Sequence, residues 1–396
     1  MSLTDTPNAN RLHIALFGRR NSGKSSLINA LTGQDIALVS NTPGTTTDLV
    51  SKAMEIQGIG PCLFIDTPGF DDEGELGELR ISRTLKAIEK TDIALLLCED
   101  TTFFHEKEIL ALLKEKNIPV IPVLNKIDIR ENSDHLATYI EEQCKIHPLL
   151  ISAKEKIGIE LIRQTILEKL PSDFGQQSIT GKLVAENDLV LLVMPQDIQA
   201  PKGRLILPQV QTIRELLDKK CLVMTCTTDK FSATLQALAR PPKLIITDSQ
   251  VFKAIYEQKP KESELTSFSV LFAGYKGDIH YYVESAAVIE RLTESSRVLI
   301  AEACTHAPLS EDIGRVKLPR LLRKRIGENL QIDMVAGTDF PQDLTPYSLI
   351  IHCGACMFNR KYVLSRIERA REQHIPMTNY GVAIAFLNGI LDQIKY

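Results

Sequence analysis

Long apolar runs are absent from the sequence: none approaches the roughly 18 to 20 residues that a membrane-spanning helix requires. The chain also lacks an excess of charge of either sign, because 46 basic and 50 acidic residues give a formal net charge of −4. That balance provides no general attraction to nucleic acid or anionic lipid. The N-terminal segment MSLTDTPNANR is polar and lacks the apolar stretch of a signal peptide. These absences predict a cytoplasmic protein that has neither a membrane nor a nucleic acid as its partner.

The composition is that of a folded protein with more than one domain. A chain of 396 residues exceeds one ordinary compact domain, and 44% hydrophobic residues are sufficient for buried cores. The sequence contains eight cysteines. In a reducing compartment they are expected to be thiols or metal ligands and not disulfides.

A phosphate-binding loop is indicated by GRRNSGKSS, which follows the apolar segment LHIALF (12–17) and fits G-x-x-x-x-G-K-[ST]. Gly18 and Gly23 permit the tight turn that aims backbone N–H groups at the phosphates. Lys24 is expected to reach the β- and γ-phosphates, and the Ser25 hydroxyl is expected to ligate Mg²⁺. The residues predicted to contact the nucleotide here are Gly18, Asn21, Ser22, Gly23, Lys24, Ser25 and Ser26.

Three further motifs follow in the order typical of a GTPase. LFIDTPGFDD (63–72) ends a predicted strand at Asp66, suited to an outer-sphere Mg²⁺ contact, and the backbone N–H of Gly69 is placed to sense the γ-phosphate. VIPVLNKID (120–128) ends in an Asp carboxylate that can accept two donors from guanine, which adenine does not offer in that arrangement. LLISAK (149–154) supplies a loop to close over the base. The predicted base-binding residues are Asn125, Lys126, Asp128, Ser152, Ala153 and Lys154.

These motifs, together with NTPGTTTD, resemble the TrmE/Era-like branch of translation-factor-related GTPases. The resemblance implies that Thr46 is the switch threonine that closes on Mg²⁺, with Thr45 or Thr47 as alternatives. It also implies that Asn21 holds K⁺; the alternative is a turn residue that stabilises its own loop. Phe70 stands where Ras-type enzymes keep a water-orienting glutamine, which implies slow hydrolysis of GTP to GDP, completed by potassium, a dimer or another partner. The residues expected to carry hydrolysis are Lys24, Thr46, Asp66 and Gly69.

The middle of the chain predicts a small α/β unit without visible chemistry. EKLPSDFGQQSITGKL (168–183) interrupts the pattern with proline and glycine among polar residues and is typical of a linker. After it, the apolar segments DLVLLVMP, CLVMTCT and KLIITD alternate with helical stretches such as VQTIRELLDKK, which favours a parallel sheet. Cys221 and Cys226 flank one of these strands and are interpreted as buried thiols. The simplest hypothesis for this unit is docking or dimerisation.

The last part of the chain contains the closely spaced pair Cys353 and Cys356, preceded by His352. SRVLIAEAC (296–304) and YSLIIHC (347–353) are predicted as parallel strands, whose carboxyl ends meet at one edge of a sheet. That topology would bring Cys304 next to the pair, and Gly354 is expected to let the chain turn. Three thiols with a histidine allow a zinc site, an iron–sulfur cluster, a redox pair or plain buried cysteines.

The order of these parts, with C-x-H…H-C-x-x-C at the end, resembles the family of GTPases that mature iron–iron (FeFe) hydrogenases. APKGRLILPQVQ in the middle unit resembles that family too, so the likeness covers nearly the whole chain. The resemblance implies a 4Fe–4S cluster on Cys304, Cys353 and Cys356. The candidates for the ligand of the fourth iron are His306, His352, a carboxylate from elsewhere in the chain and water. It also implies a homodimeric scaffold that receives a diiron precursor from radical-SAM maturases and delivers it to the apo FeFe-hydrogenase.

The fold expected from all of this is three consecutive α/β domains. The first is a Ras-like P-loop GTPase domain, and two smaller parallel-sheet domains follow it. The expected ranges are 8–172 for the GTPase domain, 173–184 for the linker, 185–265 for the dimerisation domain and 266–396 for the cluster-binding domain.

Two alternatives to the maturation scaffold stay open from the sequence. The first is a ribosome- or RNA-associated assembly GTPase, supported by RVKLPRLLRKR (315–325), which has six basic and no acidic residues. The same segment is also typical of the solvated face of an amphipathic helix, and no GXXG loop or aromatic RNP motif accompanies it. The second is a GTPase in which zinc only stabilises the last domain.

Overall fold

The computed structural model describes residues 6–32, 50–56, 58–69, 83–171, 174–175, 177–195, 205–303 and 313–396. Several residues to which the sequence assigns a role lie outside these ranges. They are Thr45, Thr46, Thr47, Phe70, Cys304 and His306. The chain divides into two compact units, Met1–Phe174 and Gly175–Tyr396.

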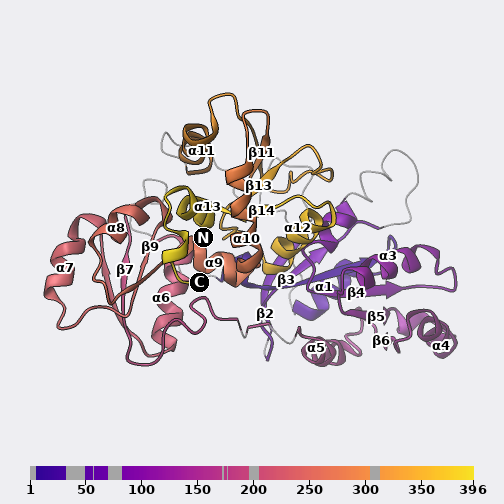
Figure 1. The fold of residues 1–396 in the computed structure, drawn as a ribbon. Coiled ribbons are helices and arrows are strands. Elements are labelled where there is room, and N and C mark those ends of the chain that lie inside the picture. Colours follow the sequence, from indigo (N-terminus) through magenta and orange to yellow (C-terminus); the bar gives the residue numbers. More distant parts are fainter. Residues whose placement is uncertain are drawn as a thin grey trace. The chain divides into compact units, whose positions relative to one another are not determined.

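The first unit is built on a six-stranded sheet with the strand order β2-β3-β1-β4-β5-β6 (Figure 1). Strand β2 runs antiparallel to β3, and all other neighbours in this sheet are parallel. The strands are β1 (Leu12–Gly18), β2 (Val50–Ile56), β3 (Gly60–Asp66), β4 (Ile93–Cys98), β5 (Val120–Leu124) and β6 (Leu149–Leu150). The helices of this unit for which the structure defines both ends are α1 (Lys24–Thr32), α3 (Phe104–Glu115), α4 (Ser133–Cys144) and α5 (Ile159–Glu168).

Strand β1 is buried on both faces, because helices cover both sides of the sheet. Leu12, Ile14 and Leu16 belong to one core, which includes side chains of α1 and α5. Ala15 and Phe17 belong to the core on the other face, which includes side chains of α3 and α4. Alternate residues of a strand point to opposite faces, so the apolar sequence of this strand, interrupted only by His13, follows from this double burial. The strand therefore presents its carboxyl end, and the loop after it, at one edge of the sheet.

The second unit contains two four-stranded sheets, and every neighbouring pair of strands in them is parallel. The first sheet has the order β10-β9-β7-β8 and the second has the order β12-β11-β13-β14. The strands are β7 (Leu189–Val193), β8 (Leu222–Cys226), β9 (Leu244–Thr247), β10 (Glu264–Ser267), β11 (Arg297–Glu302), β12 (Gln331–Ala336), β13 (Leu349–His352) and β14 (Met377–Asn379). The α/β architecture with parallel sheets that the alternating sequence pattern predicts is confirmed.

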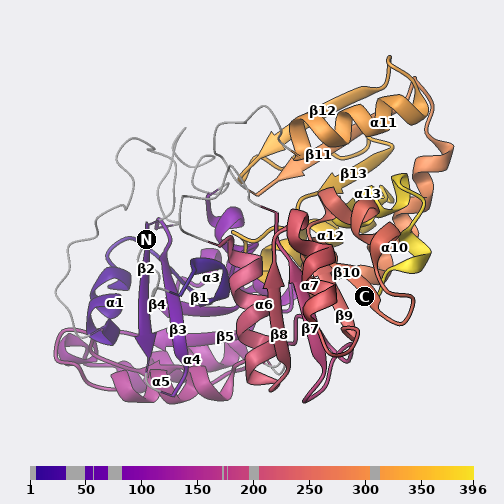
Figure 2. The same ribbon diagram turned by 90° about the vertical axis from the view of Figure 1, so that its left-hand side faces the viewer.

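Helices connect the strands of both sheets. Helix α11 lies along the sheet that contains β11 and β12 (Figure 2). The helices are α6 (Leu207–Asp218), α7 (Phe231–Ala237), α8 (Phe252–Gln258), α9 (Phe268–Lys276), α10 (Ile279–Ala286), α11 (Leu318–Ile326), α12 (Arg360–Glu372) and α13 (Tyr380–Leu387). A π-helical turn (Ile313–Lys317) precedes α11, and short 3₁₀ turns are formed by Asn8–Asn10, Ile127–Ile129, Thr228–Lys230, Ser249–Val251, Ala287–Arg291 and Leu391–Gln393.

Helix α9 connects the two sheets of the second unit. It follows β10 directly and packs against α6 on one side and against α12, α13 and β14 on the other (Figure 1). One hydrophobic core accordingly includes Leu191 of β7, Val270 of α9 and Ile350 of β13. The boundary expected between residues 265 and 266 falls within β10. The middle and last parts of the chain therefore share one core.

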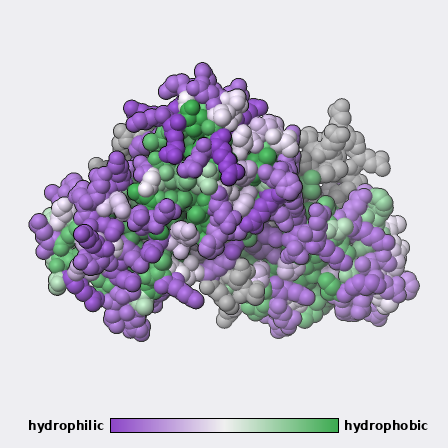
Figure 3. All heavy atoms as spheres, viewed as in Figure 1, coloured by the Kyte–Doolittle hydropathy of each residue, from purple (hydrophilic) through white to green (hydrophobic). Residues whose placement is uncertain are grey.

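The described residues include no helix long and apolar enough to cross a membrane. On the face drawn in Figure 3, hydrophobic residues form groups among hydrophilic ones.

Candidate functional site

The phosphate loop connects β1 to α1, and both of its glycines are required by close contacts. A Cβ atom added to Gly18 would lie 2.8 Å from Ser22 Oγ, and Gly23 has a φ of 92° and lies against the Asn125 side chain. The Lys24 side chain is buried, and its Nζ atom donates to the carbonyl oxygens of Gly18 at 2.9 Å and Arg19 at 2.7 Å. The lysine is thus held over the loop whose N–H groups are expected to receive the phosphates.

A candidate Mg²⁺ site lies where α1 begins and β3 ends. Ser25 Oγ donates to Asp66 Oδ2 at 2.7 Å. Burial raises the pKa of the Asp66 carboxyl, while the Ser25 hydroxyl and Lys24 oppose that rise. Within the described ranges, the Asp66 Oδ1 atom is buried without a hydrogen-bond partner. An orphaned carboxylate oxygen next to a hydroxyl fits a hard divalent cation or its water. Thr46, the third residue expected here, is outside the described residues.

Three motifs that are far apart in the sequence meet at Asn125. Its Nδ2 atom donates to the Ser22 carbonyl at 3.1 Å, and its Oδ1 atom accepts from the Ala153 N–H at 3.0 Å. The side chain therefore ties the phosphate loop to the loop expected to close over the base. The Ser152 hydroxyl beside Asp128 holds the pKa of that carboxyl below its ordinary value, so Asp128 is ionised, as an acceptor for guanine must be. Lys126 adopts a φ of 66° and donates to Glu99 at 3.1 Å.

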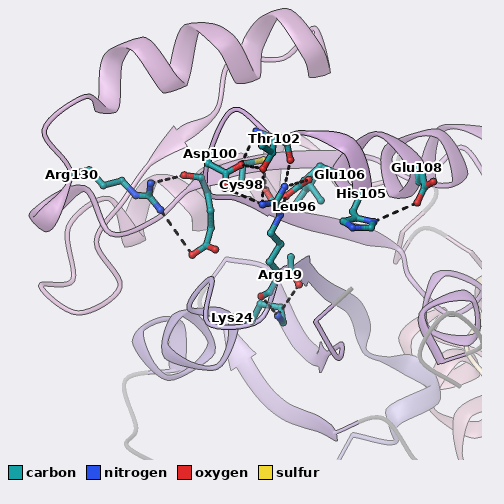
Figure 4. Close-up of polar contacts among 12 residues, drawn as sticks. Arg19, Lys24, Leu96, Cys98, Asp100, Thr102, His105, Glu106, Glu108 and Arg130 are labelled. Carbon is teal, nitrogen blue, oxygen red and sulfur yellow. Dashed lines mark hydrogen bonds and ion pairs between the residues drawn. The ribbon is translucent and has the colours of Figure 1, made fainter. Parts of the chain in front are cut away.

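Sequence reasoning missed an ion-pair network that anchors the phosphate loop. Arg19 extends from the loop to α3, where its Nε atom lies 2.9 Å and its Nη2 atom 3.1 Å from the two carboxylate oxygens of Glu106 (Figure 4). Its Nη1 atom contacts Asp100 at 3.0 Å and the Thr102 hydroxyl at 2.9 Å. Arg19 occupies a variable position of the motif and its partners lie more than 80 residues away, so no sequence signal identified it.

In the second unit, the parallel pairing expected around the cysteines is present. Strand β11 pairs with β13 from Val298 opposite Leu349 to Ala301 opposite His352. The loop after β13, residues 353–358, is here called the cysteine loop. Cys353 begins it, and its Sγ atom accepts hydrogen bonds from the N–H groups of Ala303 at 3.0 Å and Ala355 at 3.4 Å. Ala303 is the last described residue before Cys304, so β11 leads the chain to the Cys353 sulfur.

The turn of the cysteine loop differs from the expected one. The positive φ, 51°, belongs to Ala355 and not to Gly354. Burial raises the pKa of the Cys353 thiol to about 11, although the two hydrogen bonds that its sulfur accepts lower it in part. A thiol of this kind is protonated at neutral pH and loses its proton when a cation binds the sulfur. Among the described residues, no three or more metal-ligating side chains lie together. The described residues include Cys353 and Cys356 but not Cys304.

His352 is fully buried and both of its ring nitrogens are engaged. Its Nδ1 atom lies 2.8 Å from the Cys353 carbonyl oxygen, and its Nε2 atom lies 2.9 Å from Nη1 of Arg366. Burial and the Arg366 guanidinium lower the pKa of His352 to about 3, so the ring is neutral. Arg366 is buried too, stacks against the rings of Phe340, Phe358 and Tyr362, and donates to the Gly337 carbonyl. To ligate a metal, His352 would have to give up one of its two hydrogen bonds.

A buried lysine contacts the backbone of the cysteine loop. The Nζ atom of Lys276, at the end of α9, donates to the carbonyl oxygens of Ala355 at 3.2 Å, Cys356 at 3.2 Å and Phe358 at 2.6 Å. Burial lowers the pKa of Lys276 to about 8, and the two cysteines oppose that shift. Sequence reasoning assigned no role to this residue.

The fold and the nucleotide pocket define the first unit as a P-loop GTPase domain. A family model described as a 50S ribosome-binding GTPase matches residues 13–126. The chain is 40% identical over 159 residues to the tRNA modification GTPase MnmE of Dechloromonas aromatica, which covers 39% of this chain and 34% of that protein. It is 35% identical over 192 residues to the GTPase Der of Wolinella succinogenes, covering 44% of this chain and 40% of that protein. The chain thus spans little more than a third of these relatives' length.

Two solved structures overlap the chain at low similarity. An Era structure from Aquifex aeolicus bound to GDP and AlF₄⁻ has a TM-score of 0.35 and 20% identity, covering 57% of this chain and 98% of that one. The G domain of FeoB from T. maritima has a TM-score of 0.33 and 25% identity, covering 40% of this chain and 98% of that one.

The second unit is matched by two adjacent models of a single family. The hydrogen maturase F dimerization domain matches residues 179–277, and the hydrogen maturase F tetramerization domain matches residues 280–395. Together these two models match more than half of the chain, and the GTPase model matches residues 13–126 before them. The chain belongs to the hydrogen maturase F (HydF) family, and the predicted resemblance to hydrogenase maturation GTPases is confirmed.

Proposed function

We propose that this GTPase is a scaffold that binds a 4Fe–4S cluster on Cys304, Cys353 and Cys356, assembles a diiron precursor and delivers it to FeFe-hydrogenase. Radical-SAM maturases are its proposed donors and the apo-hydrogenase its acceptor, in the cytoplasm, where thiols stay reduced. The observation that carries the proposal is the hydrogen bond from the Ala303 N–H to the Cys353 sulfur, at 3.0 Å. This hydrogen bond holds Ala303, the residue before Cys304, next to the loop that carries Cys353 and Cys356.

The donors around the cysteine loop fit an iron–sulfur cluster. Backbone N–H groups that point at a cysteine sulfur favour its thiolate form and tune a bound cluster. The buried cations Lys276 and Arg366 both contact the loop, Lys276 through its backbone carbonyls and Arg366 through the ring of Phe358, and they suit a negatively charged group. When bound, the cluster would supply an iron to which the precursor could attach through one of the precursor's own ligands. Because both ring nitrogens of His352 are engaged, we propose His306 and not His352 as the candidate histidine ligand.

The nucleotide site is proposed to regulate loading or release of the precursor. Lys24, Asp66 and the Gly69 N–H would act on the γ-phosphate and its Mg²⁺, which Ser25 and Thr46 would hold. Asn21 adopts a φ of 63° in the phosphate loop and is the proposed K⁺ ligand. Hydrolysis is proposed to be slow without potassium.

The test is anaerobic reconstitution with iron and sulfide, followed by electron paramagnetic resonance of the reduced protein. Wild type should give a 4Fe–4S signal, and a Cys304/Cys353/Cys356 triple alanine variant should give none. Cys221→Ala removes another buried cysteine of the same unit and should keep the signal. Lys24→Ala in the first unit should keep the signal but abolish GTP hydrolysis, because the phosphates lose their lysine.

The same samples discriminate the zinc alternative. Zinc bound at full occupancy, without iron or sulfide, would leave a GTPase with a structural zinc site and contradict the scaffold proposal. A signal that persists in the triple variant would place the cluster on other residues.

A homodimer is proposed through the first sheet of the second unit. Strand β8 is an edge strand of that sheet, within the residues matched by the dimerization model. Leu222 and Met224 alternate along it and are 51% and 39% exposed. Alternate residues share one face of the strand, so β8 presents an apolar strip along the side on which no strand of the described residues pairs with it.

A further inference from the structure

Lys276 is an ammonium group buried almost completely beside the cysteine loop. The side chain is 2% exposed, and its three N–H donors match three carbonyl oxygens, those of Ala355, Cys356 and Phe358. These carbonyls belong to a four-residue stretch that contains Cys356. Loss of the lysine would therefore release three of the loop's backbone acceptors at once.

The charge of this lysine is not balanced by a carboxylate. In the part of the chain that the structure describes, every hydrogen bond of Nζ goes to a backbone carbonyl, and Lys276 forms no ion pair. A buried unpaired charge is costly, so such a group persists where something negative faces it or where it has a role. Its three contacts all lie in the loop that carries Cys353 and Cys356, so a negatively charged group bound to these cysteines would balance the lysine's charge.

Helix α9 makes a second connection to the same loop through Ser269, seven residues before Lys276 and thus on the same helix face. Ser269 Oγ donates to Asn379 Oδ1 at 3.1 Å, and Asn379 Nδ2 donates to the Cys353 carbonyl oxygen at 3.3 Å. The nearest heavy atom to a Cβ added on Gly354 would be Ser269 Oγ, at 4.0 Å. One face of α9 therefore supports the loop at both cysteines.

We infer that Lys276 is a positioning residue for the cysteine loop: it fixes the backbone that presents Cys356 next to Cys353, and it supplies the buried positive charge opposite a cysteine-bound cluster. The second half of this inference, the charge opposite a cluster, rests on the proposed function, whereas the first half, the positioning of the backbone, does not. Lys276 and Ser269 lie within the dimerization match, residues 179–277, whereas the cysteines lie within the tetramerization match. Helix α9 thereby couples the first sheet to the cysteine loop.

The first half is tested on the metal-free protein by amide hydrogen exchange of residues 353–358. Lys276→Met retains much of the side-chain length but removes the charge and the donors. Exchange at Ala355 and Phe358, whose N–H groups bond within the loop, should rise about tenfold or more, because hydrogen bonds to a charged group are lost. The matched control is Lys259→Met: Lys259 also donates to loop carbonyls, of Pro260 and Ser263, in the same unit, and the cysteine loop should not respond.

The second half is tested on the reconstituted protein by the midpoint potential of the cluster. Reduction adds negative charge, which a buried ammonium stabilises, so Lys276→Met should shift the potential to more negative values. Lys276→Arg keeps the charge and should shift it less than Lys276→Met, and Lys259→Met should leave it unchanged.

The two halves fail separately. In a folded Lys276→Met variant, unchanged exchange of the cysteine loop would overturn the positioning role. An unchanged midpoint potential would overturn the electrostatic role. If Lys276→Met does not fold, Lys276→Gln, which keeps amide donors without the charge, decides by the same two measurements. A wild-type protein that binds no cluster would contradict the proposed function, whereas the exchange of the metal-free loop would still decide whether Lys276 positions it.

Discussion

At the level of single residues, the buried ion pair between Arg19 and Glu106 is expected to stabilise the first unit. Glu106 is 1% exposed, and Arg19 contacts both of its carboxylate oxygens. Arg19→Met leaves that carboxylate buried without its partner, which typically costs about 3–5 kcal/mol of unfolding free energy. The phosphate loop loses its anchor to α3 at the same time, so GTP affinity should fall with stability. Chemical denaturation and nucleotide titration measure the two effects.

A second substitution separates the lost charge pair from lost packing. Glu106→Leu added to Arg19→Met removes the unpaired charge and should recover much of the stability, since apolar pairs often replace buried ion pairs without loss. Glu160→Gln, at an exposed ion pair of the same unit, should cost less than about 1 kcal/mol. Equal losses in Arg19→Met and Glu160→Gln would show that the Arg19 network contributes little.

The sequence predicted the residues whose chemistry requires a fixed type at a fixed spacing. Lys24 and Asn125 belong to such patterns, and the structure brings the motifs that contain them together. Arg19 and Lys276 act through partners 87 and about 80 residues away, at positions where the motif permits any residue or where no motif exists. Their roles depend on burial and on the packing of helices, which spacing along the chain does not encode.

At the level of elements, Glu215 of α6 holds the segment that enters the second unit. It accepts hydrogen bonds from the Ser178 hydroxyl at 2.8 Å, the Thr180 N–H at 2.8 Å and the Thr180 hydroxyl at 2.6 Å, and Lys219 lies 3.4 Å away. Burial would raise the pKa of Glu215, but the hydrogen bonds from Thr180, Ile179 and Ser178 outweigh it and hold the pKa below its ordinary value of 4.5. Folding therefore favours the ionised carboxylate.

The depressed pKa gives a signed dependence of stability on pH. The contribution of Glu215 is fully present above the unfolded-state value of 4.5 and is lost as the pH falls through the lower folded-state value. Wild type should exceed Glu215→Gln by about 1–2 kcal/mol of unfolding free energy at pH 7. That difference should shrink below pH 4.5, as denaturation at several pH values would reveal. The exposed Glu186→Gln should differ little from wild type throughout; a Glu215 difference that grows on acidification would contradict the assignment.

Elements were predictable where both faces of a strand are buried. The runs that became β1, β7 and β13 are apolar for that reason, apart from the buried His13 and His352. Strand β12 has a largely half-buried pattern, and β14 has only three residues, so neither gave a comparable signal. The shared core around α9 was not predictable either, because Val270 and its neighbours are apolar whichever sheet they cover.

At the level of the whole molecule, the proposed dimer contact is strand β8, at the edge of the first sheet of the second unit. Leu222→Glu places a charge in the apolar strip of β8 and should weaken the proposed dimer about tenfold or more, because a charge buried at an interface without a partner is costly. Leu222 is 51% exposed in the single chain, so the fold of each copy should be retained. Leu161→Glu is the control: Leu161 is 46% exposed on α5, in the first unit of the chain. Sedimentation at several concentrations measures the association, and an unchanged mass for Leu222→Glu would exclude β8 as the contact.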